Sequence, residues 1–190
     1  MKRKREILKK NKYLINIIIR LSTIFPRTVH KFLFKLVRNQ ENYLAMFVRY
    51  VCVKNCAKTC GDNVAIFSNV YLFNMQNLEL GDNVSIHPMC YIDASGGIQI
   101  GNDVSIAHAC TILSEEHIYT ALDRNIKDQG VRLKATTVSN NVWVGAGARI
   151  LAGCYLEEGS IIASGAVVKN KVKGNTIVGG VPAKFIKERG

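Results

Sequence analysis

Of the four histidines in the sequence, His117 has the surroundings best suited to chemistry. It lies near the start of residues 114–137, where an otherwise regular pattern of aliphatic residues stops. A long irregular segment inside a repetitive domain is usually functional. Imidazole titrates near neutral pH, so it can take up and return a proton during a reaction. The sequence therefore indicates His117 as a candidate general base, with a structural loop histidine as the alternative.

The other three histidines have plainer surroundings. His87 and His108 fall at the second and third positions of six-residue units, which places both side chains on the outside of a repeat. His30 lies in the basic N-terminal segment, where we expect an ordinary surface residue. Two glutamates directly precede the candidate base, and they either fix its tautomer or form a solvated pair.

A six-residue repeat must position these groups. Neither an α-helix nor a plain strand has a period of six. A triangular solenoid has this period, with three six-residue units in each coil, short strands on the sides and turns at the corners. We expect it to begin near Cys60 and to end after Val172. After the interruption the aliphatic series runs Val138, Val144, Ile150, Leu156, Ile162 and Val168.

Composition and charge divide the chain. Of its 190 residues 48% are hydrophobic, which is enough for a packed core, and the net charge is +12. Residues 1–58 hold fifteen Lys and Arg against two acidic residues, a net +13, and residues 59–190 have a net charge of −1. The excess charge therefore belongs to an N-terminal leader. We expect no nucleic-acid partner for the repeat domain.

The leader, residues 1–58, has the pattern of amphipathic helices. An apolar face that includes Leu14, Ile15, Ile18 and Leu21 ends at Pro26, and further helical stretches cover residues 29–37 and 44–53. One interpretation is that these helices cap the solenoid. The other, compatible with it, is peripheral contact with an anionic membrane. Neither a signal peptide nor an apolar run long enough to span a bilayer is found, so we expect a cytoplasmic protein.

The six cysteines suggest a reducing compartment. Cys90, Cys110 and Cys154 recur at the fifth position of the units, where small residues fill the core. Another three, at spacings of four from Cys52 to Cys60, are interpreted as a helical stripe running into the first coil, with a metal site as the alternative.

Beyond residue 173 the repeat pattern ends. We expect a loop over residues 174–184 and a short helix that starts at Pro182. The predicted organisation is thus a leader (1–58), a repeat domain (59–173) and a C-terminal loop and helix (174–190).

Three segments of the chain resemble the hexapeptide-repeat acyltransferases. They are residues 141–146, 162–168 and 179–184, and the resemblance covers residues 60–188. It is strongest to the sugar O-acetyltransferases, namely the galactoside, maltose, colanic-acid and capsule enzymes. It implies a mainly β fold, a left-handed parallel β-helix, and a homotrimer with sites between subunits. It also implies acetyl-CoA as co-substrate, a saccharide acceptor and no metal.

The resemblance gives roles to several residues. The segment from Thr111 to His117 matches the motif that supplies the base, which takes the acceptor hydroxyl proton and returns it to the coenzyme A thiolate. Many relatives have Asp or Asn where this chain has Ile118, so the part played by that neighbour is in doubt. Asp93 is implied to hold the acceptor or orient His117, with a turn-capping role as the alternative. His87 is implied to contact the acceptor.

The implied cofactor contacts lie further along the chain. Small residues there would let the pantetheine arm approach the backbone. Relatives often have Thr-Lys at residues 169–170, so that match is weaker. A trimer contact is the alternative for the tryptophan. The implied contacts are Trp143, Ala146, Ser164, Lys169, Asn170, Lys184 and Lys187.

Other functions remain open on the same scaffold. An N-acyltransferase of an amino sugar, serine or an antibiotic would need the same base. A non-catalytic scaffold in a polysaccharide-synthesis complex would not need His117. A γ-class carbonic anhydrase is disfavoured, because two of its ligands are five residues apart whereas His108 and His117 are nine apart. The sequence does not identify the acceptor, and a lipid-linked surface-polysaccharide precursor is one hypothesis.

Overall fold

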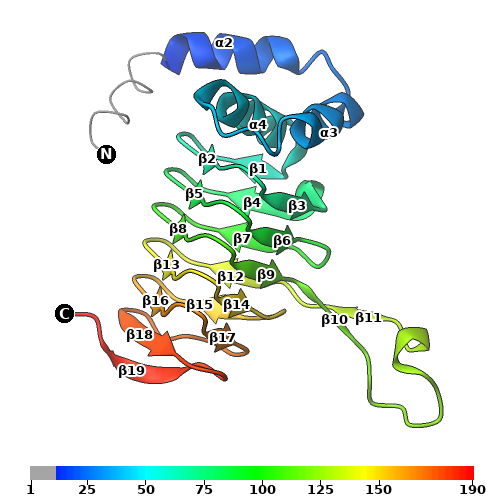
Figure 1. Ribbon diagram of the computed structural model, residues 1–190, viewed down its shortest axis with the longest axis vertical. Helices are drawn as coiled ribbons and strands as arrows, with labels where there is room; N and C mark the ends of the chain where they lie inside the picture. Colours follow the sequence, from blue (N-terminus) through cyan, green and yellow to red (C-terminus); the bar gives the residue numbers. More distant parts are fainter. Residues whose placement is uncertain (1–11) are drawn as a thin grey trace.

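The computed structural model describes residues 12–190, with side chains from Tyr13 onward. Stacked coils form an elongated body with helices over one end and a C-terminal strand at the other, as Figure 1 shows. An arm leaves the body to one side. The predicted mainly β fold, a left-handed parallel β-helix, is confirmed.

Three helices form the described part of the leader: α2 (Lys12–Ser22), α3 (Arg27–Leu36) and α4 (Tyr43–Cys56). Pro26 lies at the N-cap of α3, so the expected break is present. Asn42 caps α4, and its side-chain oxygen accepts a hydrogen bond of 2.8 Å from the Ala45 amide. The part of the predicted first helix that precedes residue 12 lies outside the described residues.

The helix α4 closes the first coil. Cys52, Val53 and Cys56 are buried in the same hydrophobic core as the coils, as the helical-stripe interpretation predicts. The buried Arg49 guanidinium donates hydrogen bonds to the carbonyls of Ile66 (2.9 Å) and Val37 (2.6 Å). One side chain thus ties the cap, the chain after α3 and the first coil together. The capping interpretation is confirmed for the part of the leader that the structure describes, residues 12–58.

One expectation for the leader is wrong. His30 is buried, and its Nε2 lies 3.0 Å from the Ser22 carbonyl oxygen, because α3 packs this side chain beneath the end of α2. Within the apolar face predicted for α2, Ile15 packs against the core together with Ile19, whereas Leu14 and Leu21 are exposed. The apolar arc of α2 is wider than the part that the core covers, so the sequence pattern could not select the inward part.

The coils are built from three parallel sheets, one on each side of a triangle. Two-residue offsets give the first two coils twenty residues each, the third coil contains an insertion, and the later coils have eighteen. Sheet A contains β1 (Thr59–Cys60), β4 (Leu78–Leu80), β7 (Ile98–Ile100), β12 (Thr136–Val138) and β15 (Tyr155–Leu156). Sheet B begins with β2 (Ala65–Ile66), β5 (Ser85–Ile86), β8 (Ser105–Ile106), β13 (Trp143–Val144) and β16 (Ile161–Ile162). Sheet C contains β3 (Tyr71–Phe73), β6 (Tyr91–Asp93), β9 (Thr111–Leu113), β14 (Arg149–Ile150) and β17 (Val167–Val168).

The register stacks like residues on like. In sheet B, Ile86 pairs with Ile106, which pairs with Val144, and all three are fully buried. An isolated coil could not bury such a column, so neighbouring coils stabilise one another. Cys90, Cys110 and Cys154 lie inside this core as free thiols, as expected.

The C-terminal expectation is wrong. Instead of a loop and a helix, residues 174–190 contain β18 (Thr176–Gly179) and β19 (Lys184–Glu188). The strand β18 pairs in parallel with β16, and β19 pairs antiparallel with β18. The last strand of a stack has unpaired backbone groups, and the chain satisfies them by folding back through Pro182. This edge pairing outweighs the local preference for a helix.

Candidate functional site

The arm interrupts the stack between the third and fourth coils, where sheet C turns to sheet A (the CA corner). It contains β10 (Glu115–His117) and β11 (Val131–Leu133), an antiparallel pair in which His117 lies opposite Val131. A short 3-10 helix, η2 (Ile126–Asp128), lies between them. The break in the repeat at residue 114 is confirmed, and the coil resumes at Thr136. The expected loop is thus largely a hairpin that projects from the body (Figure 1).

His117 itself is exposed on this arm. No hydrogen bond to its imidazole occurs within residues 12–190. Glu116 forms an ion pair of 2.7 Å with Lys134 and one of 3.8 Å with Arg132, so it is held on the opposite face of the hairpin. Alternation along β10 places Glu115 on the same face as His117, which leaves Glu115 as the nearer carboxylate.

Asp93 lies at the root of the arm. Its Oδ1 accepts hydrogen bonds from the Ser95 amide (3.0 Å), the Ser95 hydroxyl (2.7 Å) and the Asn74 side chain (3.1 Å). The Ser114 hydroxyl donates to the Asp93 carbonyl and accepts from the Gly96 amide. Asp93 therefore caps its own turn, as the alternative interpretation predicts, and that turn is joined to the first residue of the arm.

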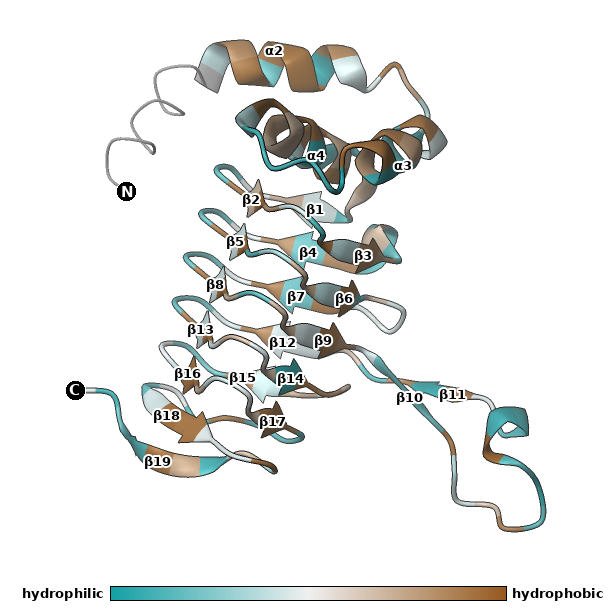
Figure 2. Ribbon diagram, viewed as in Figure 1, coloured by the Kyte–Doolittle hydropathy of each residue, from teal (hydrophilic) through white to brown (hydrophobic). Residues whose placement is uncertain are grey.

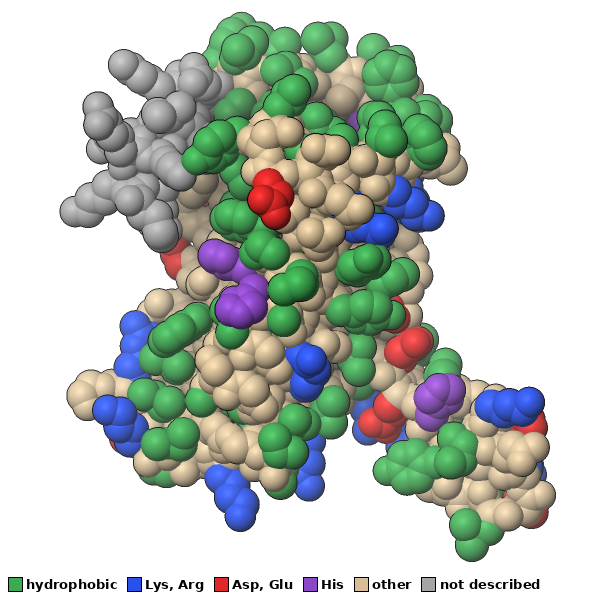
Figure 3. All heavy atoms as spheres, viewed as in Figure 1, with side chains coloured by type: hydrophobic (Ala, Val, Ile, Leu, Met, Phe, Trp, Pro, Cys, Tyr) green, Lys and Arg blue, Asp and Glu red, His purple; other side chains and the backbone are tan. Residues whose placement is uncertain are grey.

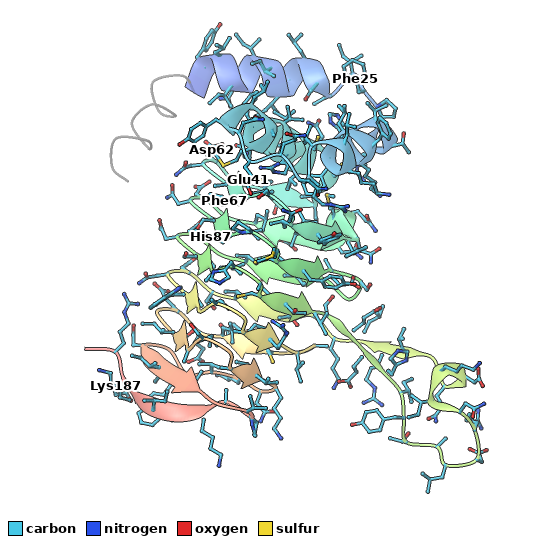
Figure 4. The ribbon with its side chains drawn as sticks, viewed as in Figure 1. Phe25, Glu41, Asp62, Phe67, His87 and Lys187 are labelled. Carbon is cyan, nitrogen blue, oxygen red and sulfur yellow. The ribbon has the colours of Figure 1, made fainter. Side chains whose placement is uncertain are left out.

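His87 lies at a different corner, where sheet B turns to sheet C (the BC corner). Its ring stacks on Phe67 with centroids 4.7 Å apart and an interplanar angle of 11°. Burial lowers the pKa of His87, and the nearby His108 lowers it further. Figure 4 shows Phe67 and His87 on successive coils. Figure 3 shows histidine side chains on this face of the coils and, separately, on the arm.

His108 had no assigned role in the sequence, although the twenty-residue coil length gives a signal for it. One coil separates residues 87 and 107, so His108 comes within one residue of lying directly beneath His87. The two rings thus form a pair at the BC corner. From the sequence alone the two histidines were separate outward-facing residues, because their alignment depends on the length of the coil.

A column of small residues continues the BC corner below the histidine pair. Gly145 and Ala146 occupy the corner of the fourth coil, and Ala163 and Ser164 that of the fifth. The corners stack closely: a Cβ added to Gly145 would lie 2.6 Å from the Ile162 carbonyl oxygen. This is the part of the surface where an extended ligand could approach the backbone.

Further predicted cofactor contacts lie on sheet B beside this column. Trp143 is 53% exposed and pairs with Ile161, which pairs with Ile177, which pairs with Lys187 of β19. Lys184 lies opposite Gly179 on the same strand pair. One register column thus leads from the tryptophan to a lysine at the C-terminal end of the stack, where Figure 4 labels Lys187.

The two remaining predicted cofactor contacts lie away from the BC corner and sheet B. Lys169 and Asn170 follow β17 and are exposed at the CA corner. Two neighbouring lysines form ion pairs, Lys171 with Glu157 and Lys173 with Glu188 at 3.3 Å. The Lys171 ammonium holds the pKa of Glu157 below its usual value. These ion pairs neutralise two of the lysines in the basic cluster that was expected to face the cofactor phosphates.

The described residues contain no group of three or more His, Cys, Asp or Glu side chains placed to hold a metal ion. The groups that could do chemistry instead form two sets in each chain. The arm set, at the CA corner, consists of His117 and Asp93. The BC set consists of the His87–His108 pair and the small-residue column. One side of the triangle, sheet C, separates the two sets.

Comparison with known proteins agrees with this architecture. Residues 135–170 match the family described as bacterial transferase hexapeptide (six repeats). The chain is similar to chloramphenicol acetyltransferase of Escherichia coli, with 43% identity over 54 residues that cover 28% of this chain and 26% of that protein. The matched segments span only 22–38% of the length of the curated relatives.

Solved structures match far more of the chain. A hexapeptide-repeat acetyltransferase of Vibrio cholerae, complexed with acetyl coenzyme A, superposes with a TM-score of 0.75 at 20% identity, covering 86% of this chain and 87% of that one. A maltose O-acetyltransferase of Clostridium difficile gives 0.72 at 23% identity, covering 87% of each chain. The chain therefore has the fold of the hexapeptide-repeat acetyltransferases.

Proposed function

We propose that this hexapeptide-repeat chain is an acetyl-CoA-dependent O-acetyltransferase that acts on a saccharide hydroxyl with His117 as general base. The observation that carries the proposal is the placement of an exposed histidine on an arm that breaks an otherwise regular coil stack. Similarity to acetyltransferases, including one that acts on maltose and one that binds acetyl coenzyme A, supports the reaction class.

The reaction that suits this site is direct transfer. The imidazole of His117 takes the proton of the acceptor hydroxyl while the oxygen attacks the thioester carbonyl. The carbon–sulfur bond then breaks, and the departing thiolate receives the proton from the imidazolium. No covalent acyl-enzyme forms, so a single histidine suffices. Asp93 and His87 are the proposed acceptor contacts, and Asp93 has one carboxylate oxygen occupied by its own turn.

The BC corner is the proposed place for coenzyme A. Its small residues allow the pantetheine arm to approach the main chain. On this proposal Ala146 and Ser164 line the arm, the exposed Trp143 covers it, and Lys184 and Lys187 face the phosphates as point charges. Lys169 and Asn170 remain proposed contacts, although they lie at the other corner of the same chain.

The working site would lie between two copies of the chain. Each copy has the arm set and the BC set on different corners of its triangle, so His117 of one copy would meet the small-residue column of its neighbour. A closed ring of three identical subunits repeats this contact at each interface. We therefore propose a homotrimer in which neighbouring surfaces shield the imidazole from bulk water.

We propose a cytoplasmic protein that acts in polysaccharide biosynthesis, with peripheral contact to the inner face of the membrane through residues 1–58. The concentration of positive charge in this leader supports the contact. None of the helices described in residues 12–190 has the length and hydrophobicity to cross a bilayer.

A thiol-release assay with acetyl-CoA tests the function across a panel of sugars and glycan precursors. We expect His117→Ala to lower turnover by about 10²–10⁴-fold, as the loss of a general base does. Lys127→Ala, a change at an exposed residue further along the same arm, should keep near-wild-type turnover. An unchanged rate in His117→Ala would remove this residue from the role of base.

Amino sugars, serine and chloramphenicol belong in the same panel, because the matched segment is similar to a chloramphenicol acetyltransferase. Treatment of the product with mild base separates the outcomes, since it cleaves esters and leaves amides intact. A base-stable product would replace O-acetylation by N-acetylation. If no acceptor in the panel raises thiol release above background, the result would favour the non-catalytic scaffold.

A further inference from the structure

The apolar side chains of α2 cover a wider arc of the helix than the part that packs on the core. Ile15 and Ile19 pack toward the core, while Leu14 and Leu21 are 57% and 60% exposed on the outer side. The apolar stripe of a surface helix is normally buried against a neighbour. The outer side of α2 is therefore a surface that lacks its complement within residues 12–190. Figure 2 shows α2 as predominantly hydrophobic at the end of the molecule.

The exposed apolar surface continues beyond α2. The turn to α3 exposes Ile24 and Phe25, and α3 exposes Phe32 and Leu36 one turn apart. Figure 3 shows hydrophobic side chains gathered over this end of the molecule. Contiguous patches of this kind mark sites of interaction. We call this surface the cap face: Leu14, Ile18, Leu21, Ile24, Phe25, Phe32 and Leu36.

Basic side chains accompany the cap face. Arg20, Arg27, Lys31 and Lys35 are exposed on the same two helices, and Glu41 is the one acidic residue in the described leader. Lys31 and Lys35 directly precede the exposed Phe32 and Leu36 in sequence. Apolar residues flanked by lysine and arginine are the composition of a surface that lies in the interface of an anionic bilayer.

We infer that the cap face docks on an anionic lipid bilayer, with its apolar side chains in the headgroup region and its basic side chains against lipid phosphates. The helices are too short to span, so they would lie in the plane of the interface. In Figure 1, α2 lies across the end of the coil stack. Docking through this end directs the stack away from the membrane, with β19 as its far end.

This orientation has a consequence for the acceptor, which rests on the proposed function. The arm leaves from the third coil, so its root lies beyond the first coil by two coil spacings, about 10 Å at roughly 4.8 Å per coil, and the helices add further height. An acceptor hydroxyl that reaches His117 must therefore stand off the bilayer. A lipid-linked oligosaccharide whose acceptor sugar is several units from the lipid meets this requirement. A monosaccharide attached directly to a lipid phosphate does not.

Vesicle co-sedimentation of the full-length protein tests the docking. The probes are vesicles of phosphatidylcholine with and without phosphatidylglycerol, at low and high salt. We expect binding to the anionic vesicles, weakened by salt. Leu21→Asp and Phe25→Asp should each lower the affinity by about tenfold or more, since each removes an apolar side chain from the interface. Leu122→Asp, at a fully exposed leucine of the arm, is the matched control and should bind as wild type does.

The charge contribution is tested separately. Lys31→Gln combined with Lys35→Gln keeps the cap face apolar and removes two positive charges. We expect weaker binding to anionic vesicles and a shallower salt dependence. Equal binding of wild type to both kinds of vesicle would contradict the anionic preference.

A tryptophan reporter shows which end of the molecule enters the interface. In a Trp143→Phe background the chain has no other tryptophan, so Phe25→Trp reports from the cap face and Phe185→Trp from β19 at the opposite end. The two phenylalanines are 57% and 60% exposed, which matches them. Anionic vesicles should shift the emission of the first reporter to shorter wavelength, and brominated lipids should quench it. A shift of the Phe185→Trp reporter instead would overturn the orientation.

Other outcomes separate this inference from its rivals. If a second copy covered the cap face, the Phe25→Trp emission would shift with protein concentration in the absence of vesicles. In analytical ultracentrifugation without lipid, Leu21→Asp would then halve the mass of the assembly. Vesicle binding without any acetyl transfer would sustain the docking and refute the proposed function. If transfer occurs, Leu21→Asp should leave turnover of a soluble sugar unchanged and lower turnover of a lipid-linked acceptor in vesicles. Equal turnover of both would overturn the acceptor class.

Discussion

The Ser114 hydroxyl donates a hydrogen bond of 2.7 Å to the main-chain carbonyl of Asp93 and accepts one of 2.9 Å from the Gly96 amide. These contacts join the first residue of the arm to the turn that follows β6 in the preceding coil. The fit is close, because a Cβ on Gly96 would lie 2.2 Å from the Ser114 carbonyl oxygen. The direction in which the arm leaves the body is therefore set by its root.

Replacement of Ser114 should weaken this root. Ser114→Ala removes the buried hydroxyl that bonds the part-buried Asp93 carbonyl and Gly96 amide, and we expect a loss of about 1–3 kcal/mol in the free energy of unfolding. Urea denaturation measures it as a lower midpoint at constant slope. Ser105→Ala, which loses a 3.3 Å contact between partly buried hydroxyls, is the control and should change the free energy by about 0.5 kcal/mol or less. Equal losses of unfolding free energy in the two variants would show that the Ser114 contacts stabilise the fold no more than the Ser105 contact does.

Mixing of two inactive variants tests whether the site is shared. His117→Ala damages the arm set, and Ser164→Trp blocks the BC corner at an exposed position that leaves the core intact. After dissociation and random reassembly of equal amounts, roughly a quarter of the interfaces in a closed ring join an intact arm to an intact corner. We expect a corresponding fraction of wild-type turnover. Activity no higher than that of each variant treated alone would place the whole site within one chain.

The pH dependence of stability should report the surroundings of His87. Its pKa in the folded protein is lowered by burial and by His108, so the unfolded chain binds more protons as the pH falls below about 6.5. The stability that comes from the neutral imidazole is fully present above that pH. As the pH falls below it, the folded state becomes progressively less stable. His87→Phe keeps the ring stacked on Phe67 and removes the titration. Urea denaturation of both proteins between pH 7.5 and 5.0 should show a steeper loss for wild type, and parallel curves would contradict this assignment.

Two glycines in corners should respond differently to alanine. A Cβ on Gly81 would lie 2.5 Å from Asn102 Oδ1 and 2.7 Å from the Gly101 carbonyl carbon, so Gly81→Ala forces adjacent coils apart. Gly165 has φ +70° but open space around it, so Gly165→Ala carries only the cost of a left-handed backbone, about 1 kcal/mol. Thermal unfolding should show the larger loss for Gly81→Ala. The reverse order would mean that the coil spacing adapts at this corner.

Much of the architecture follows from the sequence by itself. A six-residue period excludes helices and plain strands, and buried aliphatic columns such as Ile106 over Val144 are its direct consequence. The break at residue 114, the break at Pro26 and the core positions of Cys90 and Cys110 were all predictable. These features are local or periodic, so neighbouring residues carry enough information to specify them.

Other features depended on contacts between distant segments. The inward side of α2 was decided by α4 beneath it, because Ile15 and Leu14 are equally apolar. The strand β19 formed at the expected helix because β18 presents an open edge. His87 and His108 became neighbours only when the coil length aligned them. Likewise, Asp93 lies at the root of the arm and His87 lies at another corner. The triangular coil places residues that are close in sequence on different sides.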